Sequence, residues 1–276
     1  MLLLLDGYNL LYRSFVTLPS AITGGDGRPI NAVYGMVAAI LRLMRELEPA
    51  RIVAAFDVPE IPTFRHDLYP LYQAQRGPLG GAESEEFLRQ VALAQRSLPP
   101  LGIAALTYPG YEADDIMGTL ASRGAAAEER AVIVSTDKDL LQLVRPGIEV
   151  LVPGKAGLHI RDADGVRARL GVHPSGVTTY KALAGDPSDN IPGVPGIGAR
   201  TAIRLVERYG SLEAIYDDLA GLPARTAAAL REARDSAFLF RRLVTIQTDL
   251  PLEGDLASLP TPAFTPDAGI RDLLNR

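Results

Sequence analysis

The sequence contains no cysteine and no tryptophan, and only three of its 276 residues are histidine. Without cysteine, disulfides, thiol catalysis and cysteine-ligated zinc are excluded. The three histidines, His66, His159 and His173, lie too far apart in the sequence to indicate a zinc site. Any metal bound by this chain must therefore be a hard cation with oxygen ligands. The lack of cysteine also agrees with a reducing compartment, so we expect a cytoplasmic protein.

Long apolar runs are lacking too. The apolar stretch at residues 1–5 ends at Asp6 and is too short for a signal peptide or a membrane span. Hydrophobic residues make up 47% of the chain and charged residues 22%, which is typical of a globular protein with one large or two modest domains. We therefore expect no contact with a membrane.

Lysine is scarce, because Lys138, Lys155 and Lys181 are the only lysines among 28 basic residues. The formal net charge of −5 argues at first against nucleic-acid binding, which usually needs a basic surface. The strength of that objection depends on where the acidic side chains lie.

The first half of the chain alternates short apolar runs with segments of helical spacing. The runs predict buried strands at 2–5, 52–56, 103–106 and 132–134, and the spacing predicts helices near 32–43 and 87–98 and from 116. Such alternation indicates an α/β fold with a mainly parallel central sheet flanked by helices. Ligand sites on these sheets gather at the carboxyl ends of the strands.

The second half reads as short helices joined by glycine and proline. They are expected at Asp162–Leu170, Pro174–Leu183, Arg200–Tyr209, Leu212–Asp218 and Ala224–Leu243, followed by an extended surface segment at Leu256–Asp267. We expect two regions, an α/β core at 1–160 and a helical region with a C-terminal extension at 161–276.

Nine carboxylates stand at the junctions of these predicted elements: Asp6, Asp57, Glu112, Asp114, Asp115, Asp137, Asp139, Asp186 and Asp189. Taken singly, each aspartate is more often a helix cap or a turn former. Together they would repel unless cations neutralised them, and Mg²⁺ prefers such oxygen ligands. Removing the nine from the net charge of −5 leaves +4 for the rest of the chain. The pattern predicts metal-dependent phosphodiester chemistry.

Glycines punctuate the segment at 190–202, just before a predicted helix. Such glycines allow a tight turn, and the N-terminus of the helix offers unpaired N–H groups to an anion. The segment reads as a helix-hairpin-helix that holds a DNA backbone through Gly193, Gly196, Ile197, Gly198, Arg200 and Thr201. The alternative is a glycine-rich helix corner without a ligand, with its arginines on a solvated face.

Several motifs in order resemble the 5′-nuclease (flap endonuclease) family, in particular the 5′→3′ exonuclease domain of bacterial DNA polymerase I. They are LLLLDGYNLLYR (2–13), AAFD (54–57), TFRHDLY (63–69), PGYEADD (109–115), STDKDLLQL (135–143) and GDPSDNIPGVPGIGARTA (185–202). The resemblance covers roughly residues 2–250. Since no polymerase half follows, we expect a stand-alone member or an excised domain.

The resemblance implies a PIN/5′-nuclease-like core, a helical arch around 70–98, and a helix-hairpin-helix that grips duplex DNA with a bound K⁺ ion. It also implies that the nine acids hold two or more Mg²⁺ or Mn²⁺ ions in two regions, and that Arg65 contacts nucleic acid. The first region would comprise Asp6, Asp57, Glu112, Asp114 and Asp115, and the second Asp137, Asp139, Asp186 and Asp189. Family members cut 5′ flaps, nicked duplexes and RNA-primed 5′ ends. We expect a monomer, and nothing in the sequence indicates which polymerase or ligase it would serve.

One departure from the family pattern concerns the arch. The usual Tyr-Lys-x-x-Arg is Tyr72 to Arg76 here, with Gln73 in the lysine position. The amide of Gln73 can donate a hydrogen bond but cannot neutralise charge, so Arg76 is left as the arch cation. Lys138, between two metal-site aspartates, would pair with a carboxylate or contact the phosphate.

Three functions compete on this evidence. The leading one is a metal-dependent, structure-selective 5′-nuclease, both 5′→3′ exonuclease and 5′-flap endonuclease, acting in DNA replication and repair. The alternative is a flap- or junction-binding protein with weak catalysis because of Gln73. A PIN-type ribonuclease is the third, although such domains are usually shorter and lack a helix-hairpin-helix. Tyr8, Tyr12 and Tyr34 would stack on a terminal base or pack in the core.

Overall fold

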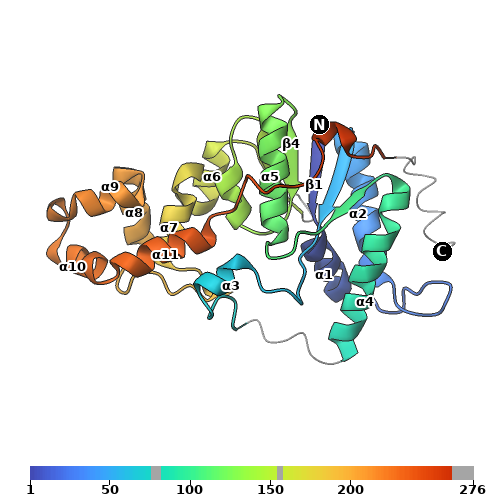
Figure 1. Ribbon diagram of the computed structural model, residues 1–276, viewed down its shortest axis with the longest axis horizontal. Coiled ribbons are helices and arrows are strands. Elements are labelled where there is room, and N and C mark those ends of the chain that lie inside the picture. Colours follow the sequence, from blue (N-terminus) through green and yellow to red (C-terminus); the bar gives the residue numbers. More distant parts are fainter. Residues whose placement is uncertain (76–81, 154–157, 263–276) are drawn as a thin grey trace.

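The computed structural model describes residues 1–75, 82–153 and 158–262. An α/β layer forms one end of the molecule, and a run of short helices extends from it (Figure 1). Among the described residues, no helix has both the length and the apolar character needed to cross a bilayer.

The sheet has the order β3-β2-β1-β4-β5-β6 within the described chain. Its strands are β1 (Leu2–Asp6), β2 (Arg51–Ala55), β3 (Ala104–Leu106), β4 (Ala131–Val134), β5 (Ile148–Val152) and β6 (Leu158–Ile160). The first five run parallel and β6 is antiparallel to β5. The four expected strands and the mainly parallel sheet are confirmed. Sequence patterns missed β5 and β6, of which the latter has three residues.

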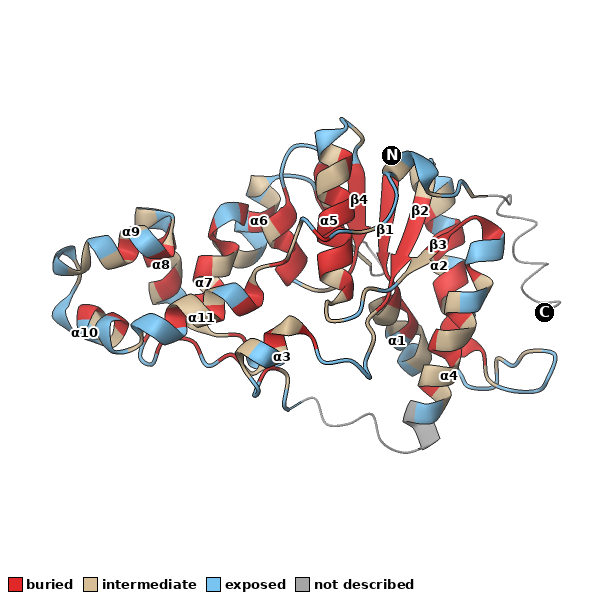
Figure 2. Ribbon diagram, in the orientation of Figure 1, coloured by how far each residue is buried: buried red, intermediate tan, exposed pale blue. Residues whose placement is uncertain are grey.

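Side chains on the two faces of the sheet bury separate apolar clusters. Leu2 and Leu4 of β1 pack in a cluster with α5 (Ala113–Ala126), whereas Leu3 and Leu5 pack in a second cluster on the other face. The helices of that second cluster are α1 (Gly7–Thr17), α2 (Asn31–Leu47) and α4 (Ala82–Ser97). Figure 2 shows the strands as the most completely buried part of the fold.

The helical half contains α6 (Ala163–Leu170), α7 (Val177–Ala184), α8 (Ala199–Tyr209), α9 (Leu212–Asp217), α10 (Ala224–Glu232) and α11 (Arg234–Val244). One long helix over 224–243 was expected, and this was wrong. Ala233 ends α10, and the bend there lets both Leu230 and Ala237 bury in the same cluster. The sequence pattern could not show this, because both helices have similar apolar spacing.

The chain after α11 runs back along α5 and ties the two halves together. Arg123 of α5 donates to the main-chain oxygens of Leu250 (2.9 Å) and Leu252 (3.1 Å). Val166, Val172, Val177 and Val206 of the helical half also belong to the apolar cluster that includes Leu2 and Leu4. The halves therefore share a core, and the expected boundary at residue 160 stays a prediction. Leu256–Ser258 forms a 3-10 turn in the segment expected to be extended, whose end lies outside the described residues.

Candidate metal centre and nucleic-acid interface

Acidic residues converge at the carboxyl edge of the sheet. Asp6 is the last residue of β1, and Asp57 and Asp137 follow the neighbouring strands β2 and β4 within a few residues. Glu112 and Asp114 stand at the N-terminus of α5, beside the same edge. Because these strands are parallel, their carboxyl ends meet at one place, as the sequence predicted.

Asp6 is held in a fixed position at the centre of this edge. One carboxylate oxygen accepts from the main-chain N–H of Asn9 (3.0 Å) and the other from the Ser135 hydroxyl (2.7 Å). The pKa of Asp6 is raised to about 7, chiefly by burial and to a lesser extent by Asp57 and Asp137, against the lowering effect of these two hydrogen bonds. The side chain thus caps α1 and at the same time belongs to a group of mutually repelling carboxyls.

The other acids of the first group repel one another in the same way. Burial raises the pKa of Glu112 to about 8, and Asp57 and Asp189 add to the rise although Arg65 opposes it. The pKa of Asp114 is raised well above its usual range by burial and then by Asp137, Asp6, Glu112 and Asp57. Carboxyls that raise one another's pKa in this way offer oxygen ligands to a hard divalent cation, so the residues fit the expected metal.

Asp115 lies beside these acids but differs from them, because a buried cation pairs with both of its oxygens. Arg65 donates to them in a bidentate pair at 2.7 and 2.8 Å, and the two side chains are 2% and 0% exposed. Arg65 also lies 3.2 Å from a Glu112 oxygen and donates to the main-chain oxygen of Leu243 at 2.8 Å. The expectation that Arg65 contacts nucleic acid does not fit this burial. Its position is that of a structural cation beneath the acids.

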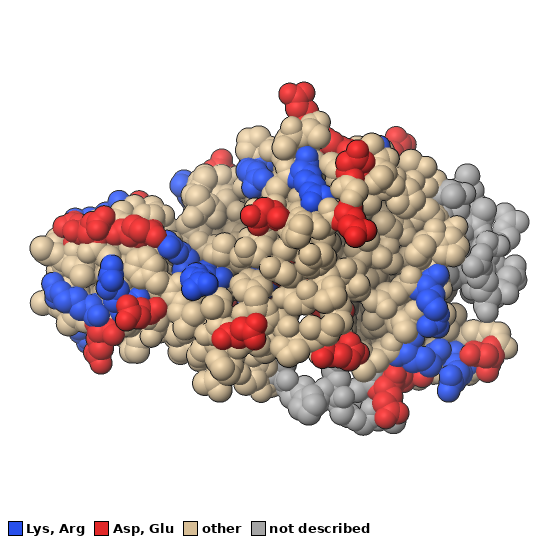
Figure 3. Space-filling model, in the orientation of Figure 1, with Lys and Arg blue, Asp and Glu red and all other residues tan. Residues whose placement is uncertain are grey.

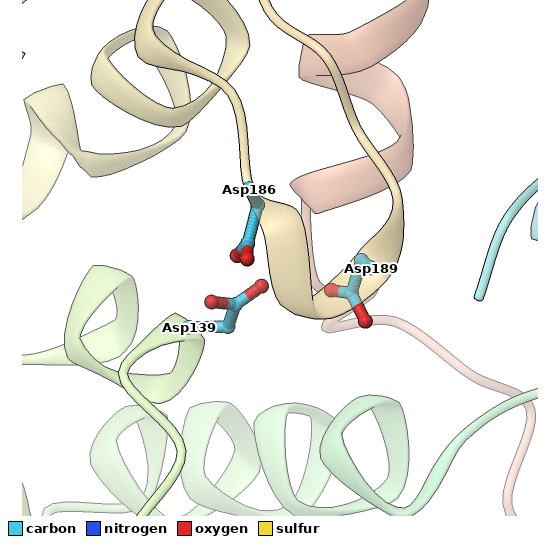
Figure 4. Close-up of side chains that lie close together, drawn as sticks. All are labelled: Asp139, Asp186 and Asp189. Atoms are coloured by element: carbon cyan, nitrogen blue, oxygen red, sulfur yellow. The ribbon is translucent and has the colours of Figure 1, made fainter. Parts of the chain in front are cut away.

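The second group comprises Asp139, Asp186 and Asp189, each with one carboxylate oxygen within 4.8 Å of the others. In Figure 4 the carboxylates of Asp139 and Asp186 point toward each other, and Asp189 lies on the same turn as Asp186. All three side chains are buried. This spacing is compatible with oxygen ligands around one divalent cation.

Lys181 of α7 enters the second group, which sequence reasoning missed. Its ammonium contacts Asp139 and lies 2.5 Å from an oxygen of Asp186. Burial alone would raise the pKa of Asp186, but the charge and hydrogen bond of Lys181, with the Ser188 hydrogen bonds, lower it below its usual value. The available signal was that one of the three lysines stands five residues before Asp186 and is the one charged residue of its helix.

The sequence analysis named two further cations, Lys138 and Arg76. Lys138 is exposed, and no ion pair joins it to a carboxylate in the described part of the chain. Arg76 falls outside the described residues. The catalytic roles of both therefore stay predictions. Gln73 is described, and its side-chain amide lies between Glu112 and Asp189.

The glycine-rich segment forms a hairpin between α7 and α8, which confirms the helix-hairpin-helix. Gly193 (φ 71°) packs so closely on the end of α7 that a Cβ would lie 2.4 Å from the Gly185 nitrogen. Ile197 is buried and anchors the hairpin to the helical core. Gly196, Gly198 and Arg200 are exposed and Thr201 is partly exposed, so this face is open to a ligand.

The tyrosines near the acids pack against an aromatic residue of α4. Tyr8 and Tyr12 meet the Phe87 ring edge-on, with centroid separations of 5.0 and 5.6 Å. Tyr12 remains 50% exposed and Tyr34 38% exposed. Packing therefore accounts for Tyr8, while Tyr12 and Tyr34 keep surface that a base could contact.

Basic side chains do not gather in a single patch on the face shown in Figure 3. Lysine and arginine alternate there with acidic residues along the helical half and the α/β layer. On this face, the positive charge of the residues outside the two acidic groups is therefore dispersed.

Comparisons with known proteins agree with this arrangement. A family model described as "5'-3' exonuclease, N-terminal resolvase-like domain" matches residues 1–171, and one described as "5'-3' exonuclease, C-terminal SAM fold" matches residues 172–267. The second match covers the hairpin-containing half that a PIN-type ribonuclease was expected to lack.

Individual relatives and structures point the same way. A thermostable DNA polymerase I from Thermus thermophilus is 39% identical over 274 residues, which are 99% of this chain and 31% of the relative. The chain thus spans about a third of the length of this curated relative. A T5 5′-exonuclease structure with bound zinc has a TM-score of 0.75 and 21% identity, covering 99% of this chain and 98% of that one. A bacteriophage T5 flap endonuclease complex with DNA and metal ions has a TM-score of 0.71 and 20% identity, covering 99% and 95%. From the two matched models and the extent of the polymerase match, this chain belongs to the 5′-3′ exonuclease family.

Proposed function

We propose that this protein is a metal-dependent, structure-selective 5′-nuclease that hydrolyses phosphodiester bonds of DNA, as a 5′→3′ exonuclease and a 5′-flap endonuclease, in replication and repair. The observation that carries the proposal is the convergence of acids from β1, β2, β4, α5 and the turn at 186–190. The raised pKa values of Asp6, Glu112 and Asp114 are what a hard divalent cation would reverse.

Two or more Mg²⁺ or Mn²⁺ ions would be divided between the two groups of acids. Asp6, Asp57, Glu112, Asp114 and Asp137 would hold the first region, and Asp139, Asp186 and Asp189 the second. When bound, such ions polarise the scissile phosphate and lower the pKa of a water nucleophile. Asp115 would act through its neighbours, because Arg65 occupies both of its oxygens.

The remaining residues would orient the acids and the substrate. Ser135 and Asn9 fix the Asp6 carboxylate, and Lys181 holds Asp139 and Asp186 together by charge. The exposed hairpin before α8 would bind the phosphates of the downstream duplex without reading its sequence, with a K⁺ ion on its carbonyl groups. Lys138 is exposed beside Asp137 and Asp139 and would contact the phosphate or a carboxylate. Cleavage would leave a 3′-hydroxyl and a 5′-phosphate.

The substrates would be DNA with 5′ flaps, nicks or 5′ ends, including RNA-primed ends. This choice rests on the family and on the similarity to a flap endonuclease whose structure contains DNA. The protein would act as a monomer in the cytoplasm, and the polymerase or ligase that it would serve is open.

Asp137→Asn tests the metal assignment. Its remaining oxygen can still accept from the Asp139 N–H, which the Asp137 carboxylate now does at 2.8 Å, so the local turn is kept. We expect loss of Mg²⁺-dependent cleavage of a labelled 5′-flap DNA, with duplex binding still measurable. Asp164→Asn is the control, since Asp164 is exposed on α6, away from both acidic groups. Cleavage by Asp137→Asn at the parent rate would show the assignment to be wrong.

A second candidate function is a flap- or junction-binding protein with weak catalysis. It is favoured by Gln73, whose neutral amide stands among the acids. Incubation of the protein with labelled flap DNA in Mg²⁺ and then in Mn²⁺ separates the two functions. Binding without product in either metal would favour the binding protein, and product in either would favour the nuclease.

A further inference from the structure

We propose that Gln73 is a positioning residue that ties the two acidic groups together through the side chains of Glu112 and Asp189. The proposal rests on the proposed function and adds to it a residue-level link between the two metal regions. It concerns residues 69–75, which we call the docking segment, and the turn at 186–190.

The side-chain amide of Gln73 donates to both carboxylates. Its Nε2 lies 2.9 Å from Asp189 Oδ1 and 3.4 Å from Glu112 Oε1. An amide NH₂ has two donor hydrogens, so one nitrogen can serve two acceptors. Glu112 belongs to the first acidic group and Asp189 to the second. One side chain therefore spans the gap between them.

Further contacts fix the position of Gln73. Its main-chain N–H donates to the Asp189 main-chain oxygen at 3.0 Å, so backbone and side chain hold the same residue. Gln73 has a left-handed backbone with φ 53°, which an L-residue adopts only where its surroundings enforce it. The preceding Tyr72 is 4% exposed and packs in a cluster with Ile191 and Phe240, while its hydroxyl lies 3.3 Å from Glu112 Oε2.

The docking segment is also bonded to the turn on both sides of Gln73. Asn190 Nδ2 donates to the Leu71 main-chain oxygen at 2.7 Å. Gln75 Nε2 donates to the main-chain oxygens of Pro187 (2.9 Å) and Ser188 (2.8 Å). These bonds reach only main-chain oxygens on the segment or the turn. Of the amides that join the two elements, Gln73 is the one that reaches carboxylates.

A neutral donor has a physical advantage at this place. Glu112 and Asp189 repel, since Asp189 contributes to the raised pKa of Glu112. A bridging ammonium would draw them together but would cancel one of their charges. The amide holds the two carboxylates without adding a positive charge that would compete with cations. Partners of metal ligands typically contribute about 10- to 100-fold to metal affinity or activity.

Two variants remove the tie in different ways. Gln73→Met keeps the length of the side chain and removes its donors. Gln73→Asn keeps the donors, tolerates a left-handed backbone and is one methylene too short to reach both carboxylates. Gln75→Met is the matched control, because Gln75 docks on the same turn through main-chain oxygens and has no carboxylate among its partners in the described part of the chain. Far-UV circular dichroism and melting temperature verify that each variant folds. If Gln73→Met does not fold, Gln73→Asn tests the positioning role.

The measurements are the affinity for Mn²⁺ by calorimetry on DNA-free protein and the single-turnover cleavage rate of a 5′-flap DNA. We expect Gln73→Met and Gln73→Asn each to weaken Mn²⁺ binding and slow cleavage by about 10-fold, with flap binding in Ca²⁺ retained. Gln75→Met should change neither by more than about 2-fold. Gln73→Lys, which restores a donor to both carboxylates, should cleave faster than Gln73→Met.

Parent-like Mn²⁺ affinity and cleavage in both Gln73→Met and Gln73→Asn would overturn the positioning role. Equal losses in Gln75→Met would also overturn it, because docking of the segment rather than the tie would then be responsible. A parent protein that neither binds Mn²⁺ nor cuts the flap would instead refute the proposed function, so the two failures are distinguishable.

Discussion

The buried ion pair of Arg65 and Asp115 gives the most direct test of how the acidic edge is supported. Arg65 is 2% exposed, and its guanidinium serves both Asp115 oxygens, a Glu112 oxygen, and the main-chain oxygens of Leu243 (2.8 Å) and Thr245 (3.2 Å). Arg65→Met removes the only cation at this place among the described residues, and it leaves the buried Asp115 and the partly buried Glu112 without it. Breaking a buried pair in this way costs about 3–5 kcal/mol.

Urea denaturation in EDTA, followed by far-UV circular dichroism, measures the loss of unfolding free energy. Arg42→Met is the control, because Arg42 and Glu46 form a pair that is 59% and 49% exposed, and such pairs contribute less than about 1 kcal/mol. The double variant Arg65→Met/Asp115→Asn removes both charges and should recover part of the loss. A loss below about 1 kcal/mol for Arg65→Met would refute the supporting role of the pair.

Three other predictions concern single residues. Because the folded pKa of Asp6, about 7, exceeds its ordinary value of 3.8, the folded protein binds more protons than the unfolded chain between these values. The unfolding free energy in EDTA should therefore be highest below about pH 4 as far as Asp6 contributes, and should fall by up to about 4 kcal/mol toward pH 7. Mg²⁺ should offset the fall. Urea denaturation at several pH values in EDTA measures the unfolding free energy, and no decrease between about pH 4 and pH 7 would contradict the prediction. Lys181→Met leaves Asp139 and Asp186 without their cation, so the melting temperature of the variant in EDTA should be lower than that of the parent. Mg²⁺ should raise the melting temperature of the variant by more than that of the parent. An unchanged melting temperature in EDTA would exclude a stabilising role of Lys181 between the two aspartates. Gly193→Ala should cost more unfolding free energy than Gly196→Ala, although both have positive φ, because an added Cβ meets backbone at Gly193 and open space at the other glycine. Equal losses in urea would contradict this packing argument.

The acidic edge could be predicted from the sequence because the pattern that indicates it lies within a few consecutive residues of each strand. A short apolar run followed by aspartate places that aspartate at the end of a strand, and parallel strands bring such ends together. The hairpin was predictable for the same reason, since its glycines and prolines lie within one short segment.

Contacts between distant segments could not be predicted in this way. Arg65 appeared in a motif as a cation, and its burial depends on Leu243 and Thr245, nearly two hundred residues further along the chain. Lys181 and Gln73 approach the acids only after α7 and the turn at 186–190 have packed on the docking segment. The split at Ala233 likewise depends on the apolar cluster that both helices share.

The composition of β1 has a consequence for folding. Its four consecutive leucines fill both faces of the sheet, so sliding the strand by one or two positions would exchange leucine for leucine over much of its length. Its apolar side chains therefore do not mark which pairing is native. Asp6 does, because only the native alignment brings it to the Ser135 hydroxyl at the end of the neighbouring strand β4. Asp6, which we propose as a metal ligand, thus also specifies the register of the central strand. Replacing it would allow non-native strand pairing in addition to abolishing activity.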